Sequence, residues 1–257
     1  MIESKGAQDT QGFPEVWYEF SDPSHFWFRW RGAVLSRLLD ALPRRSGTQT
    51  RLLEIGCGTR VLSAQIESMT DWTVDGVDLS PFAIGRAVPG RGMAQVYDIS
   101  ERKPEWRQLF DGLVLFDVLE HIPNTTEFLE NAVFHLKDEG FVLINVPARQ
   151  ELYSRYDEVV GHLRRYTIQD LNREMERVGF YPLHIRYWGL LLFPIALLRR
   201  WVLRGRADEG EVVRTGFVPR NKWIKWILEL LKHTEVSFIR WTPIGTSVMG
   251  IYCRRLK

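Results

Sequence analysis

The chain has 257 residues, enough for one α/β domain with a full core and a small appendage. Hydrophobic residues make up 45% of it and charged residues 26%, which excludes a disordered or collagen-like protein. The net charge of +2 does not argue for nucleic acid, so we expect no nucleic-acid partner. The two cysteines, Cys57 and Cys253, are too few and too far apart for the disulfide framework of a small secreted protein.

The N-terminal stretch "MIESKGAQDTQGFPEV" has neither the basic start nor the apolar centre of a signal peptide. We therefore expect a cytoplasmic protein. The first predicted element is a helix over residues 24–42, because Trp27, Trp30, Val34 and Leu38 recur at helical spacing.

The next part of the chain alternates short apolar strands with helices. Residues 51–55 predict a strand and residues 60–69 a helix. The stretch "WTVDGVDLS" predicts a second strand that ends in Asp78, and Pro81 suits the first turn of a following helix. "MAQVYDIS" predicts a third strand, ending in Asp98, and "DGLVLFDVLEHI" a fourth.

The same alternation continues to the end. A predicted helix over residues 125–137 leads through the turn "KDEG" to a fifth strand, "FVLINVP". Thr167 is the expected N-cap of the helix "IQDLNREMERVGF", and Gly179 its stop. "YPLHIRYW" and "TSVMGIYCRR" predict a sixth and a seventh strand. This order favours a parallel sheet with helices on both faces.

Glycines and carboxylates recur where the predicted strands end. Gly56 and Gly58 follow the first strand, Asp78 ends the second and Asp98 the third. Each feature alone has an ordinary structural explanation, as a turn or a solvated acid. In an open parallel sheet, however, ligands bind beyond the carboxyl ends of the strands, so together these residues predict a binding site.

The motifs "LLEIGCGT", "GVDLSP", "YDIS" and "LFDVLEHIP" together resemble those of class I S-adenosylmethionine-dependent methyltransferases, in the small-molecule branch that includes ubiquinone-pathway enzymes. The resemblance spans residues 25–188 and resumes at the last strand. It implies a Rossmann-like, doubly wound, seven-stranded α/β sheet, mostly parallel with an antiparallel last strand. The predicted domains are an N-terminal tail and helical lid (1–50), the cofactor-binding core (51–188), a helical insertion (189–240) and the last strand (241–257).

The resemblance also implies roles for individual residues toward S-adenosylmethionine. The methionine part and its ammonium would lie at Glu54, Gly56, Cys57 and Gly58. The ribose would lie at Asp78 and Leu79, the adenine at Asp98 and Ile99, and the sulfonium above Phe116 and Asp117. Arg31, on the N-terminal helix, is the candidate for the methionine carboxylate.

Glu54 and Arg60 separate this interpretation from its alternatives. The carboxylate of Glu54 suits a ligand that carries an ammonium and would repel a pyrophosphate, which disfavours a nicotinamide-dependent oxidoreductase. That alternative also lacks its last glycine, since Val61 stands there. Arg60 departs from the family, which usually has glycine at this point. It is expected either to extend into solvent and weaken cofactor binding, which we favour, or to reach an anionic group in the site.

Candidate catalytic residues lie after the fourth and fifth strands. His121, His162 and Tyr166 are candidates for removing a proton from an acceptor hydroxyl. A packing or capping role is the ordinary alternative for each histidine. Arg164 and Arg165 suit an anionic acceptor.

A metal site is a second hypothesis for the same region. Asp117, Glu120 and His121 have D-x-x-E-H spacing, and His162 would complete four ligands. Some related methyltransferases hold a divalent metal on an E-x-x-E-H version of this motif. The motif "DVLEHI" also occurs in metal-free relatives, and our working expectation is that no metal is bound.

The insertion is unusually apolar. "WGLLLFPIALLRRWVLRGR" is too short and too interrupted by arginine to span a membrane, and Pro194 is expected to kink it. With "RNKWIKWILELLKH" it combines Trp and Leu with Arg and Lys, which is typical of helices that lie on a membrane surface. We expect membrane-surface contact through residues 189–233, at the inner face of the membrane. Packing of these helices on each other or on a second subunit is the alternative.

The sequence as a whole predicts an S-adenosylmethionine-dependent methyltransferase that acts on oxygen of a small or lipid-linked acceptor, such as a glycan or isoprenoid. The alternative from another class is a non-catalytic module that binds the cofactor weakly because of Arg60 and uses its apolar insertion to bind a membrane or a protein partner.

Overall fold

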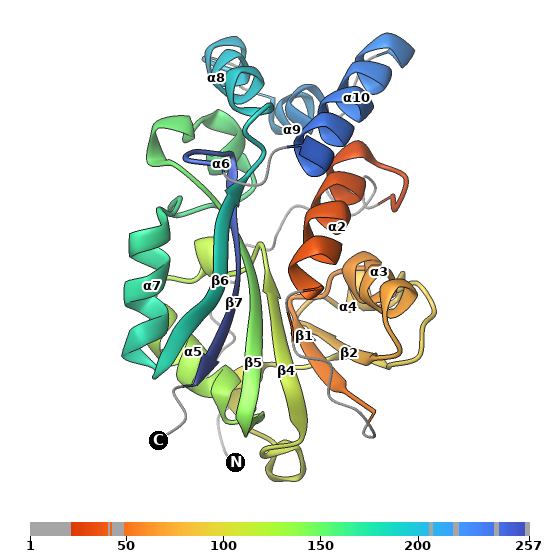
Figure 1. The fold of residues 1–257 in the computed structure, drawn as a ribbon, viewed down its shortest axis with the longest axis vertical. Coiled ribbons are helices and arrows are strands. Elements are labelled where there is room, and N and C mark those ends of the chain that lie inside the picture. Colours follow the sequence, from red (N-terminus) through yellow and green to blue (C-terminus); the bar gives the residue numbers. More distant parts are fainter. Residues whose placement is uncertain are drawn as a thin grey trace, which may run out of the picture.

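The computed structural model describes residues 22–40, 42, 49–205, 208–217, 221–238 and 242–254. These residues form a seven-stranded sheet in the order β3-β2-β1-β4-β5-β7-β6 (Figure 1). The strands are β1 (Arg51–Ile55), β2 (Thr73–Asp78), β3 (Ala94–Val96), β4 (Phe110–Phe116), β5 (Leu136–Pro147), β6 (Phe180–Trp188) and β7 (Ser247–Arg254). The pairs among β1 to β5 are parallel and β7 runs antiparallel to both its neighbours, which confirms the predicted fold class.

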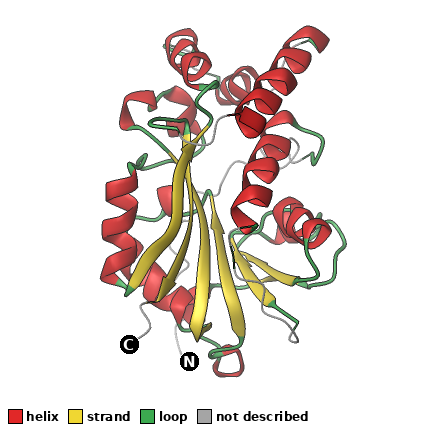
Figure 2. Ribbon diagram, in the orientation of Figure 1, coloured by secondary structure: helices red, strands yellow, loops and turns green. Residues whose placement is uncertain are grey.

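Helices cover both faces of this sheet (Figure 2). The α-helices are α2 (Phe26–Leu39), α3 (Val61–Met69), α4 (Pro81–Ile84), α5 (Thr125–Val133), α6 (Arg155–Val159), α7 (Ile168–Arg177), α8 (Phe193–Val202), α9 (Glu209–Phe217) and α10 (Lys222–Phe238). Short 3₁₀ helices are η1 (Ile99–Glu101), η2 (Pro104–Trp106), η3 (Leu119–His121) and η4 (Gln150–Leu152).

Successive side chains of the central strands point to opposite faces of the sheet, so the hydrophobic core has two parts, one on each face. Leu53 and Leu113 face the layer that contains α5 and α7, whereas Leu52 and Val114 face the layer of α2 and α3. Because both faces are buried, most residues of these strands are apolar, and this is why the strands stand out in the sequence. The sheet is therefore a fixed platform for the residues that follow its strands.

Four local expectations were wrong. The third strand ends at Val96, and Asp98 instead caps η1. The helix expected over 125–137 ends at Val133, and the expected turn "KDEG" belongs to β5, which shifts register against β4 there. Pro194 lies in the first turn of α8 and does not kink it. Proline lacks a backbone N–H, and in the first turn of a helix that N–H would have no acceptor within the helix.

The insertion between β6 and β7 contributes α8, α9 and α10. In Figure 1 these helices lie together at one end of the molecule, past the tips of the strands. Within the described ranges, we find no helix whose length and apolar character would suffice to cross a membrane.

Candidate active site

One large cavity lies at the carboxyl ends of the central strands. Its volume is about 1630 Å³, and its walls come from the strand tips and from α2, α6 and α8. Pockets for drug-sized ligands usually measure roughly 300–1,000 Å³. The cavity therefore has room for a nucleoside-sized molecule and part of a second ligand.

The glycine turn after β1 forms the cavity floor. Gly56 and Gly58 have φ angles of +74° and +52°, which glycine adopts without strain. A Cβ on Gly56 would lie 2.7 Å from Cγ2 of Val118. The Gly58 N–H donates to Oδ2 of Asp78 at 2.8 Å, so the turn and the tip of β2 are held together. All three predicted positions line the cavity, and so does Cys57, whose thiol pKa is raised by burial.

Glu54 also lines the cavity, although it is buried. Its carboxylate accepts a hydrogen bond from the Ser63 hydroxyl. Burial raises the pKa of Glu54 to about 7, against the opposing effects of Ser63 and Arg31. A carboxyl group whose pKa is near neutral pH loses its proton readily when a cation binds beside it.

The neighbouring strand tips place the remaining predicted cofactor residues at the same cavity. Leu79, Asp98 and Ile99 all line it. Asp98 accepts a hydrogen bond from the Ser100 N–H at 2.8 Å, as the cap of η1.

Helix α2 reaches the cavity through an ion pair. Nη1 of Arg31 lies 2.7 Å from Oδ2 of Asp117, and the Arg31 guanidinium also stacks near the rings of Trp27 and Phe116. Oδ1 of Asp117 accepts from the side-chain amide of Asn145 at 2.7 Å. Burial raises the pKa of Asp117, and Arg31 opposes this shift. Arg31, Phe116 and Asp117 are thus brought together at the cavity, with Arg31 already paired to a carboxylate.

Arg60 follows neither of the two expectations. It is 2% exposed, has a φ of +63°, and does not line the cavity. Its guanidinium donates to the carbonyls of Val74 and Val88 at 2.7 and 3.1 Å and lies 3.4 Å from Oε1 of Glu67. A Cβ on Gly90 would lie 2.8 Å from Nη1 of Arg60, so glycine makes the space. Arg60 is a buried structural link between α3 and β2.

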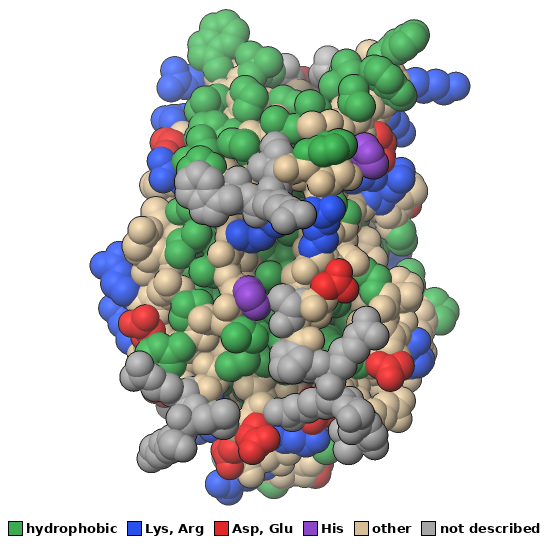
Figure 3. All heavy atoms as spheres, viewed as in Figure 1, with side chains coloured by type: hydrophobic (Ala, Val, Ile, Leu, Met, Phe, Trp, Pro, Cys, Tyr) green, Lys and Arg blue, Asp and Glu red, His purple; other side chains and the backbone are tan. Residues whose placement is uncertain are grey.

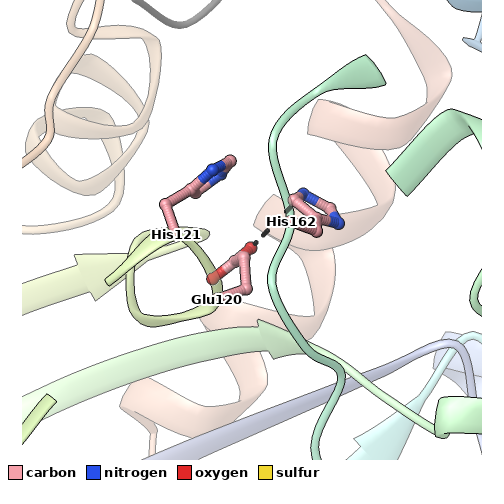
Figure 4. Close-up of side chains that lie close together, drawn as sticks. All are labelled: Glu120, His121 and His162. Carbon is pink, nitrogen blue, oxygen red and sulfur yellow. Dashed lines mark ion pairs between the residues drawn. The ribbon is translucent and has the colours of Figure 1, made fainter. Parts of the chain in front are cut away.

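His121 and His162 both line the cavity, and their rings meet edge to face with centroids 4.9 Å apart. Glu120 lies beside them, and its Oε1 is 3.8 Å from Nε2 of His162 (Figure 4). Nδ1 of His121 donates to the Gly161 carbonyl at 3.1 Å. Burial and the neighbouring His162 lower the pKa of His121 to about 3, and burial also lowers the pKa of His162. Both imidazoles are neutral at pH 7.

Asp157 forms a hydrogen bond with the ring nitrogen of His162 that points away from Glu120. Its Oδ1 accepts from Nδ1 of His162 at 2.8 Å and from Nε of Arg165 at 2.8 Å. Arg165 also donates to the Ala148 carbonyl at 3.1 Å, so its charge is engaged with the protein although it lines the cavity. Burial raises the pKa of Asp157, but the hydrogen bond from His162 and the charge of Arg165 lower it overall.

Two predicted residues lie away from the cavity wall. The Tyr166 hydroxyl is 3.3 Å from both the Leu119 carbonyl and the Glu174 carboxylate, and burial raises its pKa. Arg164 donates to the Pro123 carbonyl at 3.1 Å. Neither side chain lines the cavity.

The four-ligand metal set of the second hypothesis is not assembled among the described residues. Donor atoms of Glu120, His121 and His162 lie within 4.8 Å of one another and could hold a divalent cation. Asp117 is outside this group, because Arg31 and Asn145 occupy its carboxylate.

The sequence analysis missed two features of the site. One is Asp157, whose signal was the spacing Ser154-x-x-Asp157 of a capping box. The other is the inner face of α8, from which Leu192, Ile195, Ala196 and Arg199 line the cavity. Their i, i+3, i+4, i+7 spacing is that of one helix face, but an equally apolar outer face concealed it.

Comparison with known proteins agrees with this geometry. Residues 27–185 match the sequence family described as a methyltransferase domain. A comparison with curated proteins gives no match. The fold resembles an S-adenosylmethionine-dependent methyltransferase of Archaeoglobus fulgidus (17% identity, 87% of this chain and 94% of that chain, TM-score 0.53).

Two further solved structures are similar. Phosphoethanolamine N-methyltransferase 2 of Haemonchus contortus, in complex with S-adenosyl-L-methionine, is 20% identical over 96% of this chain and 59% of that chain, with a TM-score of 0.60. The plantazolicin methyltransferase BamL is 13% identical over 93% of this chain and 89% of that chain, with a TM-score of 0.56. At these sequence identities, the similarity to the solved structures shows the fold and nothing about the substrate. Because the family match spans well over half of the sequence, the chain belongs to the methyltransferase domain family, with the class I fold of S-adenosylmethionine-dependent methyltransferases.

Proposed function

We propose that this methyltransferase transfers a methyl group to a hydroxyl oxygen of a small, lipid-linked acceptor at a membrane surface. The observation that carries the lipid-linked part is the two-faced helix α8. Its inner face lines the cavity, whereas Leu198 and Trp201 on its outer face are 60% and 70% exposed. One helix thus separates the reaction cavity from an apolar surface.

The cavity residues fit the cofactor of this class. Three carboxylates line one space: Glu54 in β1, Asp78 at the end of β2 and Asp98 at the start of η1. They suit a ligand with an ammonium group, ribose hydroxyls and an adenine amino group, and Gly56 lets backbone approach it closely. When bound, S-adenosylmethionine would supply an activated methyl group, carried on its sulfonium, for transfer to the acceptor oxygen.

The protein's own contribution to the reaction is to orient the acceptor and to accept its proton. His162 lines the cavity and is neutral, so its Nε2 is a suitable base for the hydroxyl proton. The aromatic side chains of Trp27 and Tyr156 line the same space and help to exclude water.

The outer surface near the cavity suits a membrane containing anionic lipids. Exposed apolar residues gather on α8 and α10, at the end of the molecule that Figure 3 shows covered by hydrophobic side chains. Trp223 and Trp226 on α10 are among the most exposed. Lys222 directly precedes Trp223, and Lys225 directly precedes Trp226 in the sequence. Aromatic and basic residues side by side favour the headgroup region of a bilayer.

Vesicle sedimentation tests the membrane part. We expect the protein to co-sediment with anionic vesicles at low salt and the double variant Leu198→Glu/Trp201→Glu to remain in solution. Leu183→Glu, on the edge strand β6, is the control, since Leu183 is also exposed (46%) but lies outside α8 and α10. Absence of binding by the wild-type protein at low salt would exclude the membrane contact.

Mass spectrometry tests the reaction. A lipid extract incubated with the protein and S-adenosylmethionine should yield a product with one added methyl group, absent when the cofactor is omitted. Methyl transfer to a water-soluble acceptor alone would contradict the lipid-linked class.

A further inference from the structure

Glu120 is a buried carboxyl group without a hydrogen-bond partner in the part of the chain that the structure describes. It is 0% exposed, it lines the cavity, and neither of its oxygens accepts or donates a hydrogen bond among the described residues. Buried polar groups in folded proteins almost always have a hydrogen-bond partner. The missing partner indicates that a polar group of a ligand binds here.

His162 is held in one tautomer. Nδ1 lies 2.8 Å from Oδ1 of Asp157, and a carboxylate can only accept, so the proton is on Nδ1. Nε2 therefore carries a lone pair. That atom is the one closest to Glu120 (Figure 4).

The two side chains are close enough to share one ligand atom placed beside them. The 3.8 Å from Nε2 of His162 to Oε1 of Glu120 is too long for a direct hydrogen bond. A single oxygen can lie about 2.8 Å from both atoms. A buried carboxyl without a counter-ion is neutral, and the burial of Glu120, with the charge of Asp117, raises its pKa well above the ordinary value.

We propose that Glu120 and His162 bind the reacting hydroxyl of the acceptor between them, and that Asp157 is the residue that positions His162. The proposal deepens the proposed function and rests on it. The neutral Glu120 carboxyl donates to the acceptor oxygen, and the hydroxyl proton moves to Nε2 of His162. As the new oxygen–carbon bond forms, the carbon–sulfur bond breaks and its electron pair stays on sulfur. The resulting imidazolium is stabilised by Asp157.

Nitrogen-15 NMR of histidine in the full chain tests the Asp157 part without any acceptor. Wild-type protein should show His162 protonated on Nδ1, with its signals assigned through His162→Gln. In Asp157→Asn, one oxygen must serve the Ser154 N–H on one side and Arg165 and His162 on the other. His162 thus loses its charged acceptor, and the fraction of its ring protonated on Nδ1 should fall. Asp170→Asn is the matched control, because Asp170 closes an equivalent capping box with Thr167 and has no histidine partner.

Either of two NMR results would overturn this part: a wild-type His162 protonated on Nε2, or an unchanged tautomer in Asp157→Asn. If that variant does not fold, the wild-type spectrum still decides.

Two variants of Glu120 test the hydroxyl site, with methyl transfer to lipid extract as the assay. Glu120→Gln keeps a neutral donor and should retain kcat within about threefold, whereas Glu120→Leu should lower kcat about 100-fold through misplacement of the acceptor. Equal losses in both variants, or activity that a chelator abolishes and a divalent cation restores, would contradict the proposal.

Calorimetry with S-adenosylmethionine distinguishes a failure of the proposed function from a failure of the roles proposed for Glu120, His162 and Asp157. All variants should bind it like the wild type. If the wild type binds it and transfers no methyl group to lipid extract, the proposed function fails, while the NMR result still stands for Asp157.

Discussion

Glu54 and Glu67 are both buried acids within one βα unit, and the structure treats them in opposite ways. Burial raises the pKa of Glu54 to about 7. Glu67 is also desolvated, but the N–H groups of Val74, Arg91 and Gly92 donate to it and lower its pKa overall. Glu54 lines the cavity, where a ligand can reach it, whereas the carboxylate of Glu67 is fully used in hydrogen bonds that hold the fold together.

Glu54→Gln should remove a pH dependence of stability. The cofactor-free folded state keeps the Glu54 proton up to about pH 7 and the unfolded state loses it near 4.5, so the free energy of unfolding falls as pH rises between these values. The loss is about 3 kcal/mol by pH 8. Urea unfolding at pH 5 and pH 8 measures it.

Glu67→Gln is the control, with the opposite sign: its carboxylate stabilises the fold above its unfolded pKa, so this variant loses stability at pH 8. The same slope in Glu54→Gln and wild type would contradict the role of burial at Glu54. Glu54→Gln should also bind S-adenosylmethionine more weakly, since its ammonium loses a charged partner.

Arg60→Gly should destabilise the protein without weakening cofactor binding directly. Glycine relieves the left-handed backbone, but Glu67 loses a buried cation and two carbonyls lose their donor. Breaking a buried pair costs about 3–5 kcal/mol, more than the roughly 1 kcal/mol regained from the backbone.

Urea unfolding and calorimetry measure the two effects of Arg60→Gly separately. Arg102→Gly is the matched control, because Arg102 also has a positive φ of +47° and its side chain is exposed. A stabilised Arg60→Gly variant that binds the cofactor more tightly would restore the expectation that Arg60 opposes binding.

At the scale of elements, the link between α2 and β4 depends on charge. Arg31 and Asp117 are 86 positions apart in sequence and form a salt bridge of 2.7 Å at the cavity. Capping explains other element boundaries: Thr167 and Asp170 start α7, and Ser80 caps α4 just before Pro81. Caps are local and can be read from sequence, whereas the Arg31–Asp117 pair cannot.

Arg31→Met should lower the free energy of unfolding by about 2–3 kcal/mol, because Asp117, whose side chain is 26% exposed, loses its cation in a partly buried site. The double variant Arg31→Met/Asp117→Asn should recover most of this loss, since no unpaired charge remains and asparagine tolerates the φ of +60° at this position.

Urea unfolding of the single and double variants measures the coupling. The Arg155–Glu158 pair is the control: its side chains are 36% and 49% exposed, so Arg155→Met should change stability by less than about 1 kcal/mol. Additive losses in the Arg31 and Asp117 variants would mean that the two residues act independently.

At the scale of the whole molecule, cofactor residues and apolar helices lie at the same end. The strand tips, α2 and α8 surround one cavity, and the exposed apolar residues of α8 and α10 lie at this same end of the molecule. In the proposed function, an acceptor anchored in a membrane would reach the cavity from this end while the sheet stays in water.

Binding to anionic vesicles should shift the tryptophan fluorescence to shorter wavelength, because Trp201, Trp223 and Trp226 move from water into the headgroup region. Raising the salt from low to about 0.5 M should weaken binding at least tenfold, since basic side chains on this surface are then screened. The triple Trp→Phe variant at these positions should lose most of the shift, and Trp106→Phe should keep it. An undiminished shift in the triple variant would place the contact elsewhere.

The sequence by itself determined the sheet and the cofactor end of the site. Central strands are buried on both faces and appear as continuous apolar runs, and a glycine turn followed by acids at strand ends has fixed consequences in a parallel sheet. For this reason Glu54, Gly56 and Asp78 were located without coordinates, and they share one cavity.

Only the tertiary structure decided what the long side chains do. Arginine and tyrosine can reach partners in several directions, so sequence position did not reveal that Arg60 turns into the core, that Tyr166 and Arg164 turn away from the cavity, or that Asp157 holds His162. Contacts between elements distant in sequence depend on packing, and packing is a property of the folded chain.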